Sequence, residues 1–373
     1  MKIVLAPDSF KGSASAVEVC AAMKRGIQKV IPDAQILEVP LADGGEGTLD
    51  ALLLGAGGFR RTVRVHGPLD ESIEADWGFL PDGTAIIELS QASGLTLTPP
   101  EKRSALRAST FGTGQLIRAA LDAGARRFFL GLGGSATTDG ATGLLSALGA
   151  RFFDERDCVL PAGGGDLSRL ARIDLQFFDQ RLQKCQFIAL CDVTNPLCGP
   201  NGAAHIFSPQ KGATPEQVLQ LDASLAHYAE ITAQHFGCDL QNRPGAGAAG
   251  GTGFGLVAYL NAQMQPGIEA VLQATEFAEK LEGADLVLTG EGSLDSQTLS
   301  GKTIAGVCRT ARTKSVPTIA LGGRIALSCE QLDELGLKSA VSIVDGPREL
   351  EWCLDNALTL IEYTTERLLR IMN

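Results

Sequence analysis

The chain opens with short apolar runs that alternate with polar loops and segments of helical periodicity. Residues 2–6 form a short run that is apolar from residue 3 onward, a polar loop follows at residues 8–13, and apolar positions then recur at helical spacing. Ser15 and Glu18 have the spacing of a capping box, which marks a helix start. The pattern predicts strand, loop and helix. A second unit of this kind over residues 36–54 indicates a parallel sheet.

The pattern changes near residue 62. Apolar and polar residues alternate over residues 73–79, and a Pro-Asp-Gly turn at 81–83 leads into the apolar residues 85–87, which predicts a β-hairpin. Strict alternation leaves one sheet face in water, as is usual in antiparallel sheets. Apolar runs followed by helical segments return at residues 285–289, 317–321 and 339–344.

We therefore predict an α/β fold. A doubly wound, flavodoxin/Rossmann-like domain with a parallel sheet is expected from residues 1–61 and 284–373, interrupted by an inserted α+β domain of residues 62–283. The apolar residues 128–130 and the helix after them fit either sheet, so the pattern leaves the position of residues 105–150 open.

Composition narrows the choice of partners. The formal net charge of −11 argues against nucleic acid or an anionic membrane as the main partner, and no apolar stretch reaches the ~18 residues that span a bilayer. The first residues turn polar too soon for a secretory signal, and nine cysteines without a Cys-x-x-Cys pair fit free thiols. We expect a cytoplasmic protein; its oligomeric state is left open.

The loop at residues 8–13 is the first candidate for binding chemistry. Asp8, Ser9, Lys11 and Ser13 offer a carboxylate, two hydroxyls and an ammonium just before a helix start, where free backbone N–H groups favour anions. Ordinary helix capping is the alternative. It does not explain Lys11, because a cation there opposes the helix dipole unless an anion binds.

Two glycine-rich loops are the next candidates. Asp43 and Glu46 lie three apart among three glycines, which suits two carboxylates that approach one metal ion or one hydroxylated ligand; a solvated turn is the alternative. The loop at 131–140 follows an apolar run and precedes a helical segment, as a polyphosphate cradle with magnesium requires, although a plain turn is also compatible. Its candidate residues are Gly133, Gly134, Ser135, Thr137, Thr138 and Asp139.

Two other segments partly match the sequence motifs of nucleotide-binding loops. Gly245–Gly250 matches the dinucleotide fingerprint, but Pro244 and a helical segment precede it where a strand is required. Gly301-Lys302-Thr303 ends like a Walker A loop, but Ser296 stands where that loop needs its first glycine. Lys302 is kept as a candidate phosphate ligand.

Acidic residues follow two further apolar runs. Asp192 comes after the run at 187–190, and Glu291 with Asp295 lies in a predicted loop at 290–295. In open α/β sheets, ligands bind outside the carboxyl ends of the strands. Acidic groups suited to Mg²⁺, a few lysines and Gly/Ser/Thr loops together indicate phosphoryl transfer, in which positioning and charge neutralisation supply most of the catalysis. The residues alone do not name the acceptor.

The amino-acid sequences of these loops resemble those of the type I glycerate kinases. The strings at residues 6–13, 42–48 and 133–137 carry the resemblance, and those at 191–197, 244–251 and 289–298 agree with it, so it runs from about residue 2 to 370. Thr138 stands where the family usually has Asn, and Ser293 where many members have Arg. The resemblance implies phosphorylation of D-glycerate with ATP and Mg²⁺ at the 2-hydroxyl, in glyoxylate or sugar-acid breakdown, with the 3-hydroxyl as the alternative.

Combining the resemblance with the loops gives expected roles. The active site is expected in a cleft between the domains, with Asp192 as the base that orients the glycerate hydroxyl and with Lys11 and Asp8 also in the catalytic set. The expected metal ligands are Asp43, Glu46 and Asp139, and the expected substrate or nucleotide ligands are Ser9, Ser13, Gly133, Gly134, Ser135, Thr137, Thr138, Glu291, Asp295 and Lys302. The rival interpretations are a non-catalytic glycerate or nucleotide sensor and a nicotinamide-dependent oxidoreductase.

Overall fold

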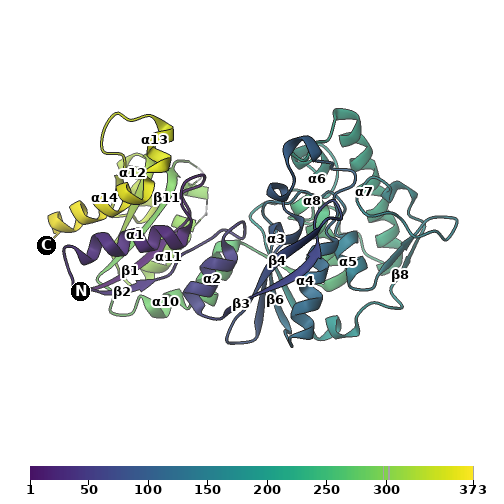
Figure 1. The fold of residues 1–373 in the computed structure, drawn as a ribbon, viewed down its shortest axis with the longest axis horizontal. Helices are drawn as coiled ribbons and strands as arrows, with labels where there is room; N and C mark the ends of the chain where they lie inside the picture. The colour runs from purple at the N-terminus through teal and green to yellow at the C-terminus, as the bar shows by residue number, and fades with distance from the viewer. Residues whose placement is uncertain (297, 301–302, 373) are drawn as a thin grey trace. The chain divides into compact units, whose positions relative to one another are not determined.

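The computed structural model describes residues 1–296, 298–300 and 303–372. The chain folds as two compact units (Figure 1). Unit 1 comprises residues 1–43, 50–57 and 268–373, and unit 2 comprises residues 44–49 and 58–267. Among the described residues, no helix is both long enough and apolar enough to cross a lipid bilayer.

Unit 1 is built on a parallel sheet whose strand order, among the described residues, is β13-β12-β11-β1-β2. The strands are β1 (Lys2–Pro7), β2 (Gln35–Glu38), β11 (Leu286–Leu294), β12 (Thr318–Ile325) and β13 (Ser339–Ser342). The chain moves outward from β1 to β2 on one side and from β11 to β13 on the other. The strand order therefore reverses between β1 and β11, the position where open α/β sheets bind ligands.

Helices cover this sheet. They are α1 (Ala16–Gln28), α2 (Thr48–Ala56), α9 (Gly267–Ala274), α10 (Phe277–Lys280), α11 (Thr303–Thr313), α12 (Cys329–Leu335), α13 (Leu350–Asp355) and α14 (Ala357–Met372), with a 3₁₀ turn at Thr298–Ser300. Helices α1 and α14 lie side by side (Figure 1), and a Cβ on Gly26 would lie 2.5 Å from the Glu362 carbonyl oxygen. This close approach requires glycine in α1.

Unit 2 contains a six-stranded sheet with the order β10-β9-β6-β5-β4-β3. The strands are β3 (Phe59–His66), β4 (Ser72–Phe79), β5 (Thr84–Glu88), β6 (Arg127–Gly131), β9 (Gln186–Leu190) and β10 (Gln263–Gln265); β7 (Arg151–Phe153) and β8 (Arg172–Asp174) form a separate pair. Strands β5, β6, β9 and β10 are parallel, and β3 and β4 extend the sheet in antiparallel fashion. The sheet is therefore mixed.

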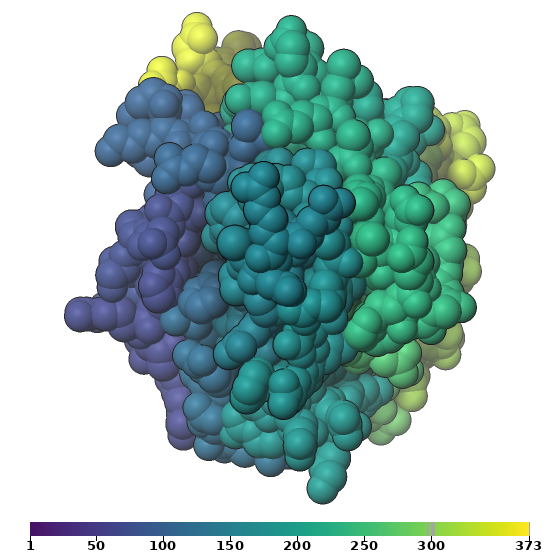
Figure 2. Space-filling model, turned by 90° about the vertical axis from the view of Figure 1, so that its right-hand side faces the viewer, coloured from purple at the N-terminus to yellow at the C-terminus, as the bar shows by residue number. Residues whose placement is uncertain are grey.

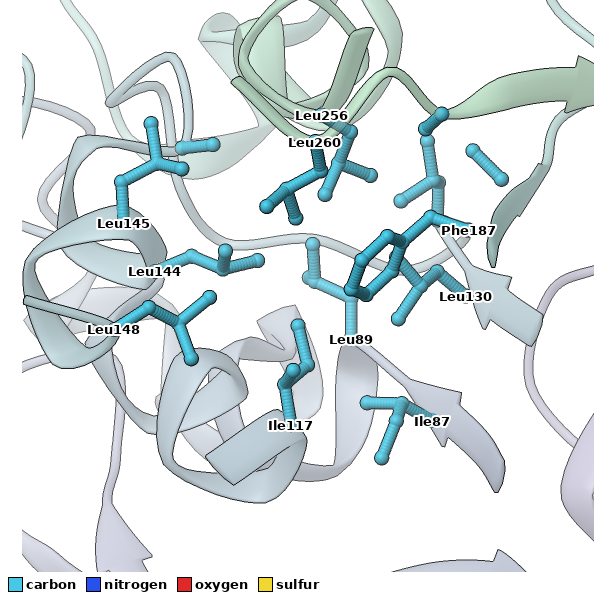
Figure 3. Close-up of a cluster of buried hydrophobic side chains, with 14 of the residues drawn as sticks. Ile87, Leu89, Ile117, Leu130, Leu144, Leu145, Leu148, Phe187, Leu256 and Leu260 are labelled. Atoms are coloured by element: carbon cyan, nitrogen blue, oxygen red, sulfur yellow. The ribbon is translucent and has the colours of Figure 1, made fainter. Parts of the chain in front are cut away.

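The core of unit 2 lies between this sheet and its helices. The helices are α3 (Ser90–Ser93), α4 (Phe111–Asp122), α5 (Thr142–Ala147), α6 (Ala203–Phe207), α7 (Pro215–Phe236) and α8 (Ala248–Leu260), with 3₁₀ turns at Leu95–Leu97, Pro100–Lys102, Leu167–Arg169, Gln180–Lys184 and Pro209–Lys211. Figure 3 shows Ile87, Leu130 and Phe187 from the strands facing leucines of the helices, all of them buried. Residues of unit 2, coloured from blue through teal to green, form most of the face that Figure 2 presents.

Most of the predicted elements are confirmed. The strand at 2–6, the capping box of Ser15 and Glu18, and the hairpin of β4 and β5 are present. Residues 127–131, which the pattern left open, form β6 of unit 2. The α/β class is confirmed, although the inserted unit has a mixed sheet because β6, β9 and β10 add parallel strands to the hairpin.

The boundaries of the units differ from the predicted ones in three places, one of which is residues 58–61, where β3 begins and which belong to unit 2. Residues 268–283 belong to unit 1, where a Cβ on Gly306 of α11 would lie 2.8 Å from Ile268. The short segment at 44–49 belongs to unit 2, because Gly44 packs against Leu190 of β9. The contacts of these two segments therefore move the boundaries away from 1–61, 62–283 and 284–373.

Candidate active site

Asp8 lies at the strand-order reversal of unit 1. Its backbone N–H donates to the Gly290 carbonyl of β11 (2.8 Å), which continues the pairing of β1 by one residue. The carboxylate accepts hydrogen bonds from the Thr303 hydroxyl (2.6 Å) and from the Ser9 backbone N–H (2.6 Å). Burial raises the pKa of Asp8, the Thr303 hydrogen bond opposes this, and the charge of Asp43 raises the pKa further. Two carboxylates therefore act on each other here.

Lys11 lies beside this carboxylate pair. Its Nζ is 3.9 Å from Asp43 Oδ2, and its side chain is 81% exposed, whereas that of Asp43 is 30% exposed. The hydroxyl of Ser13 donates to the Leu354 carbonyl (3.0 Å), so Ser13 fixes the loop against α13. The structure thus brings Asp8, Lys11 and Asp43 together. The sequence predicts this proximity for Asp8 and Lys11, which lie in one loop.

Glu46 lies on a loop that the side chain of Glu88 holds in place. The sequence pattern does not predict this role for Glu88. Glu88, at the end of β5, is 2% exposed and accepts hydrogen bonds from the backbone N–H groups of Leu49 (2.6 Å) and Gly47. Burial raises the pKa of Glu88, and Glu46 contributes in the same direction. A charged residue inside the apolar run at 85–89 is the signal that could have identified Glu88.

Replacing Glu88 by Ala should lower the free energy of unfolding by about 2 kcal/mol, because it removes charge-assisted hydrogen bonds and leaves a buried N–H group of Leu49 without its partner. Chemical denaturation measures the loss. Glu74→Ala, at an exposed position of β4, is the matched control and should stay within about 0.5 kcal/mol of the wild type. Equal losses in the two variants would contradict this role of Glu88.

The glycine-rich loop after β6 contacts the Gly44–Gly47 loop within unit 2. A Cβ on Gly133 would lie 2.5 Å from Gly45 Cα, and one on Gly131 would lie 2.8 Å from the Gly44 carbonyl oxygen. Gly134 is exposed and has a φ of +71°, which favours glycine. Backbone of two loops therefore meets at the carboxyl ends of β6 and β9, with Gly133 and Gly134 on the accessible side.

The remaining candidates of the glycine-rich loop lie beneath it. Ser135, Thr137, Thr138 and Asp139 are all buried. The Asp139 carboxylate accepts hydrogen bonds from the Thr110 N–H (2.8 Å) and hydroxyl (2.9 Å) and from two backbone N–H groups at the start of α5. Burial raises its pKa, which these hydrogen bonds oppose. Because N–H and O–H groups of the protein already donate hydrogen bonds to this carboxylate, Asp139 is not proposed as a metal ligand.

Lys211 is a second buried group that the sequence does not reveal. It ends a 3₁₀ turn, is 1% exposed, and its Nζ donates to Ser135 Oγ (2.8 Å) and to the Thr137 carbonyl (2.5 Å). Burial lowers the pKa of Lys211 to about 7, and the charge of Asp139 opposes this shift. No periodic pattern marks this lysine, since it lies in a short Pro-Gln-Lys-Gly turn.

Asp192 follows β9 and is exposed. Its Oδ1 accepts a hydrogen bond from the Gly267 N–H (3.1 Å), and the neighbouring Cys191 N–H donates to the Gln265 carbonyl after the end of the β9–β10 pairing. These bonds fix the backbone at the strand end. The carboxylate of Asp192 is therefore held in place and remains accessible to solvent.

The predicted loop at 290–295 is wrong in its conformation. Strand β11 continues to Leu294, with Glu291 opposite Gly322 and Ser293 opposite Arg324 of β12. Glu291 accepts a hydrogen bond from the Thr298 hydroxyl (2.6 Å), which in turn accepts one from the Asp295 N–H (3.1 Å). The pairing with β12 extends the strand through residues that have no apolar pattern. The candidate Lys302 lies outside the described residues.

Taken together, the described candidates fall into two groups. Unit 2 holds the two glycine loops and Asp192, and unit 1 holds the other described candidates, which are Asp8, Ser9, Lys11, Ser13, Asp43, Glu291 and Asp295. Within the described parts of the chain, no group of three or more His, Cys, Asp or Glu side chains is arranged to hold a metal ion. The expected set of Asp43, Glu46 and Asp139 is therefore not a preformed metal centre.

Comparison with known proteins gives matches over nearly the whole chain. Residues 3–373 match the sequence profile of the glycerate kinase family. The chain belongs to this family. It is 45% identical over 361 residues to a glycerate kinase of Halalkalibacterium halodurans, covering 96% of this chain and 95% of the relative.

Other glycerate kinase family members are similar over nearly the same span. A glycerate 2-kinase of Escherichia coli K12 is 45% identical over 345 residues, covering 92% of this chain and 91% of that protein. The crystal structure of a putative glycerate kinase 2 from Salmonella typhimurium LT2 has a TM-score of 0.90 and 43% identity, covering 100% of this chain and 98% of that one. The predicted family and the prediction of a kinase are confirmed.

The two departures from the glycerate kinase pattern lie in different surroundings. Thr138 is buried, and its hydroxyl lies 3.3 Å from that of Ser208. Ser293 lies in β11, where its hydroxyl donates to Asp295 (3.4 Å). Thr138 therefore contacts protein beneath the glycine-rich loop, and Ser293 contacts an acidic residue that is itself a candidate ligand.

Proposed function

We propose that this protein transfers the γ-phosphoryl group of ATP to the 2-hydroxyl of D-glycerate. The observation that carries the proposal is the half-buried Asp8 at the strand-order reversal of unit 1, beside Asp43 and Lys11, in a chain that belongs to the glycerate kinase family. The name of the Escherichia coli relative, glycerate 2-kinase, supports the 2-hydroxyl over the 3-hydroxyl. The reaction would serve glyoxylate or sugar-acid breakdown in the cytoplasm.

Asp8 and Asp43 fit a magnesium ion. Burial raises the pKa of Asp8 most, the like charge of Asp43 raises it further, and a divalent cation would relieve this repulsion between the two carboxylates. Mg²⁺ in kinase sites is commonly held by one or two carboxylates together with substrate phosphates and waters, so a preformed protein cage is not required. When bound, the ion would neutralise charge on the phosphates of ATP. Glu46, on the other unit's loop, is kept as a candidate ligand for a substrate hydroxyl.

The anionic groups of the substrates have distinct partners in this proposal. The exposed Gly134 and the neighbouring half-buried Gly133 would receive ATP phosphates through their backbone, with no Cβ at Gly134 to block a close approach. The ammonium of Lys11 would neutralise the carboxylate of glycerate or a phosphate. Ser9, Glu291 and Asp295 remain candidate ligands, and the predicted location in a cleft between the domains stays a prediction.

Asp192 would act on the acceptor hydroxyl. A base in phosphoryl transfer accepts the hydroxyl proton and orients the attacking oxygen, so it must be held in place and be accessible. Asp192 meets both conditions, because the Gly267 N–H fixes one carboxylate oxygen and the side chain is exposed. Thr137 and Thr138 are buried and support the loop in this proposal.

A coupled assay tests the proposed function. Formation of ADP that depends on D-glycerate supports the kinase. Binding of glycerate and ATP without turnover would favour the sensor instead, and a glycerate-dependent change in NAD(P)H would favour the oxidoreductase. The structure gives the oxidoreductase no support, because Gly245–Gly250 follows a loop and begins a helix, whereas the fingerprint requires a strand before it.

A further inference from the structure

The glycine-rich loop after β6 rests on a buried amine. Lys211 comes from the 3₁₀ turn Pro209–Lys211, more than seventy residues farther along the chain, and reaches two groups of the loop, Ser135 Oγ at 2.8 Å and the Thr137 carbonyl at 2.5 Å. These two bonds bracket Ala136. The amine therefore spans the segment that directly follows the half-buried Gly133 and the exposed Gly134.

Other contacts hold the far end of the same loop. The Gly140 N–H donates to the Gly250 carbonyl (3.1 Å), and a Cβ on Gly250 would lie 2.0 Å from the Thr137 carbonyl oxygen. Gly250 also has a φ of +65°, so this position requires glycine both for its backbone conformation and for the close approach to Thr137. The string Gly245–Gly250, which imitates a dinucleotide fingerprint, thus packs beneath this loop.

The cost of burying the Lys211 side chain must be offset by the interactions that it makes. Lysine is rarely buried completely, because transfer of its charged group from water is costly. An apolar side chain would fill the same space without that cost, but it would leave the Ser135 hydroxyl and the Thr137 carbonyl without this donor. An amine donates both hydrogen bonds whether it is charged or neutral. What Lys211 supplies is therefore a fixed position for the loop.

We propose that Lys211 is a positioning residue that fixes the Gly131–Gly140 loop so that the backbone of Gly133 and Gly134 is preorganised for an ATP phosphate. The kinetic part of this proposal rests on the proposed function. Besides the Gly140 contact, the backbone of the loop is tied by the Gly133 N–H to the Gly44 carbonyl (3.4 Å), by the Ala136 N–H to the Ser93 carbonyl (2.9 Å) and by the Leu95 N–H to the Gly134 carbonyl (2.8 Å). Those bonds do not reach Ser135 Oγ or Thr137, so Lys211 supplies a separate restraint.

The kinetic test uses Lys211→Met, which keeps the length of the side chain and removes its donors. We expect the KM for ATP to rise at least tenfold, with kcat within threefold and the KM for D-glycerate within twofold of the wild type. Ser135→Ala should raise the KM for ATP about threefold. The double variant should be no worse than Lys211→Met alone, because both changes break the same bond.

Lys184→Met is the matched control. Lys184 also lies at the end of a 3₁₀ turn of unit 2, but it is exposed, so its KM values should equal those of the wild type. A general loss of stability in Lys211→Met would lower the amount of active enzyme and therefore the apparent kcat. It would not raise the KM for one substrate alone.

Amide hydrogen exchange tests the positioning without any turnover. The amides of residues 133–136 should exchange at least tenfold faster in Lys211→Met than in the wild type or in Lys184→Met. If folded Lys211→Met shows wild-type exchange there and a wild-type KM for ATP, the proposal is overturned. If Lys211→Met does not fold, Ser135→Ala decides by the same two measurements. A wild type that does not use ATP and glycerate would overturn the kinase proposal, while loop exchange would still decide the role of Lys211.

Discussion

Replacing Asp192 by Asn should lower kcat about 10³-fold, which corresponds to about 4 kcal/mol of transition-state stabilisation. The amide keeps the shape of the side chain, and its carbonyl oxygen can still accept the hydrogen bond from the Gly267 N–H. It cannot accept a proton from the glycerate hydroxyl. The KM values for ATP and D-glycerate should therefore stay within about threefold of the wild type, as steady-state kinetics would show.

Asp239→Asn is the control for this result. Asp239 is also an exposed aspartate of unit 2 whose Oδ1 accepts a backbone hydrogen bond, from Gln241, so the same substitution at that position should leave kcat unchanged. Normal turnover in Asp192→Asn would remove Asp192 from the role of base. A loss of this size in Glu291→Gln or Asp295→Asn, with no loss in Asp192→Asn, would move the role to unit 1.

Replacing Lys11 by Ala should lower kcat/KM by 10²- to 10³-fold, or roughly 2–4 kcal/mol, if its ammonium neutralises charge that develops on a bound anion. The fold should remain intact. Lys11 is 81% exposed and lies 3.9 Å from Asp43, and exposed ion pairs typically contribute about 1 kcal/mol or less to stability. Thermal unfolding measured beside the kinetics separates a loss of function from a loss of structure.

Lys314→Ala is the matched control in unit 1. Lys314 is also an exposed lysine with an acidic partner, Glu282 at 3.2 Å, and it lies in none of the candidate loops. Its variant should keep the kcat/KM of the wild type. If Lys11→Ala is folded and equally active, the interpretation of the loop at 8–13 as an anion site is incorrect and helix capping explains it.

The sequence predicts those parts of the fold in which local pattern and tertiary environment agree. Residues 3–6 are continuously apolar, and they form the centre of β1, which lies between two parallel neighbours. The alternation at 73–79 likewise becomes β4 of the hairpin. The second half of β11 has no such pattern, because residues 290–293 are held extended by their pairing with residues 321–324 of β12 and not by a pattern of their own.

The residues of the candidate site could likewise be predicted only where the local sequence pattern indicates them. Asp8, Lys11 and the glycine loops were found because polar residues directly follow apolar strands. Glu88 and Lys211 could not be found in this way, because their partners lie 39 and 74–76 residues away in the sequence. Charged residues are normally solvated, so only the fold reveals which of them are buried to hold a loop.

The most direct test of the proposed reaction is the structure of its product. The protein is incubated with ATP, Mg²⁺ and D-glycerate, and the new phosphomonoester is observed by proton-coupled ³¹P NMR. Phosphorylation at the 2-hydroxyl places the phosphorus next to a single C–H proton and gives a doublet, which is the predicted result. A triplet, from phosphorus next to the CH₂ group of 3-phosphoglycerate, would contradict the 2-hydroxyl, and the absence of any phosphoglycerate would contradict the kinase itself.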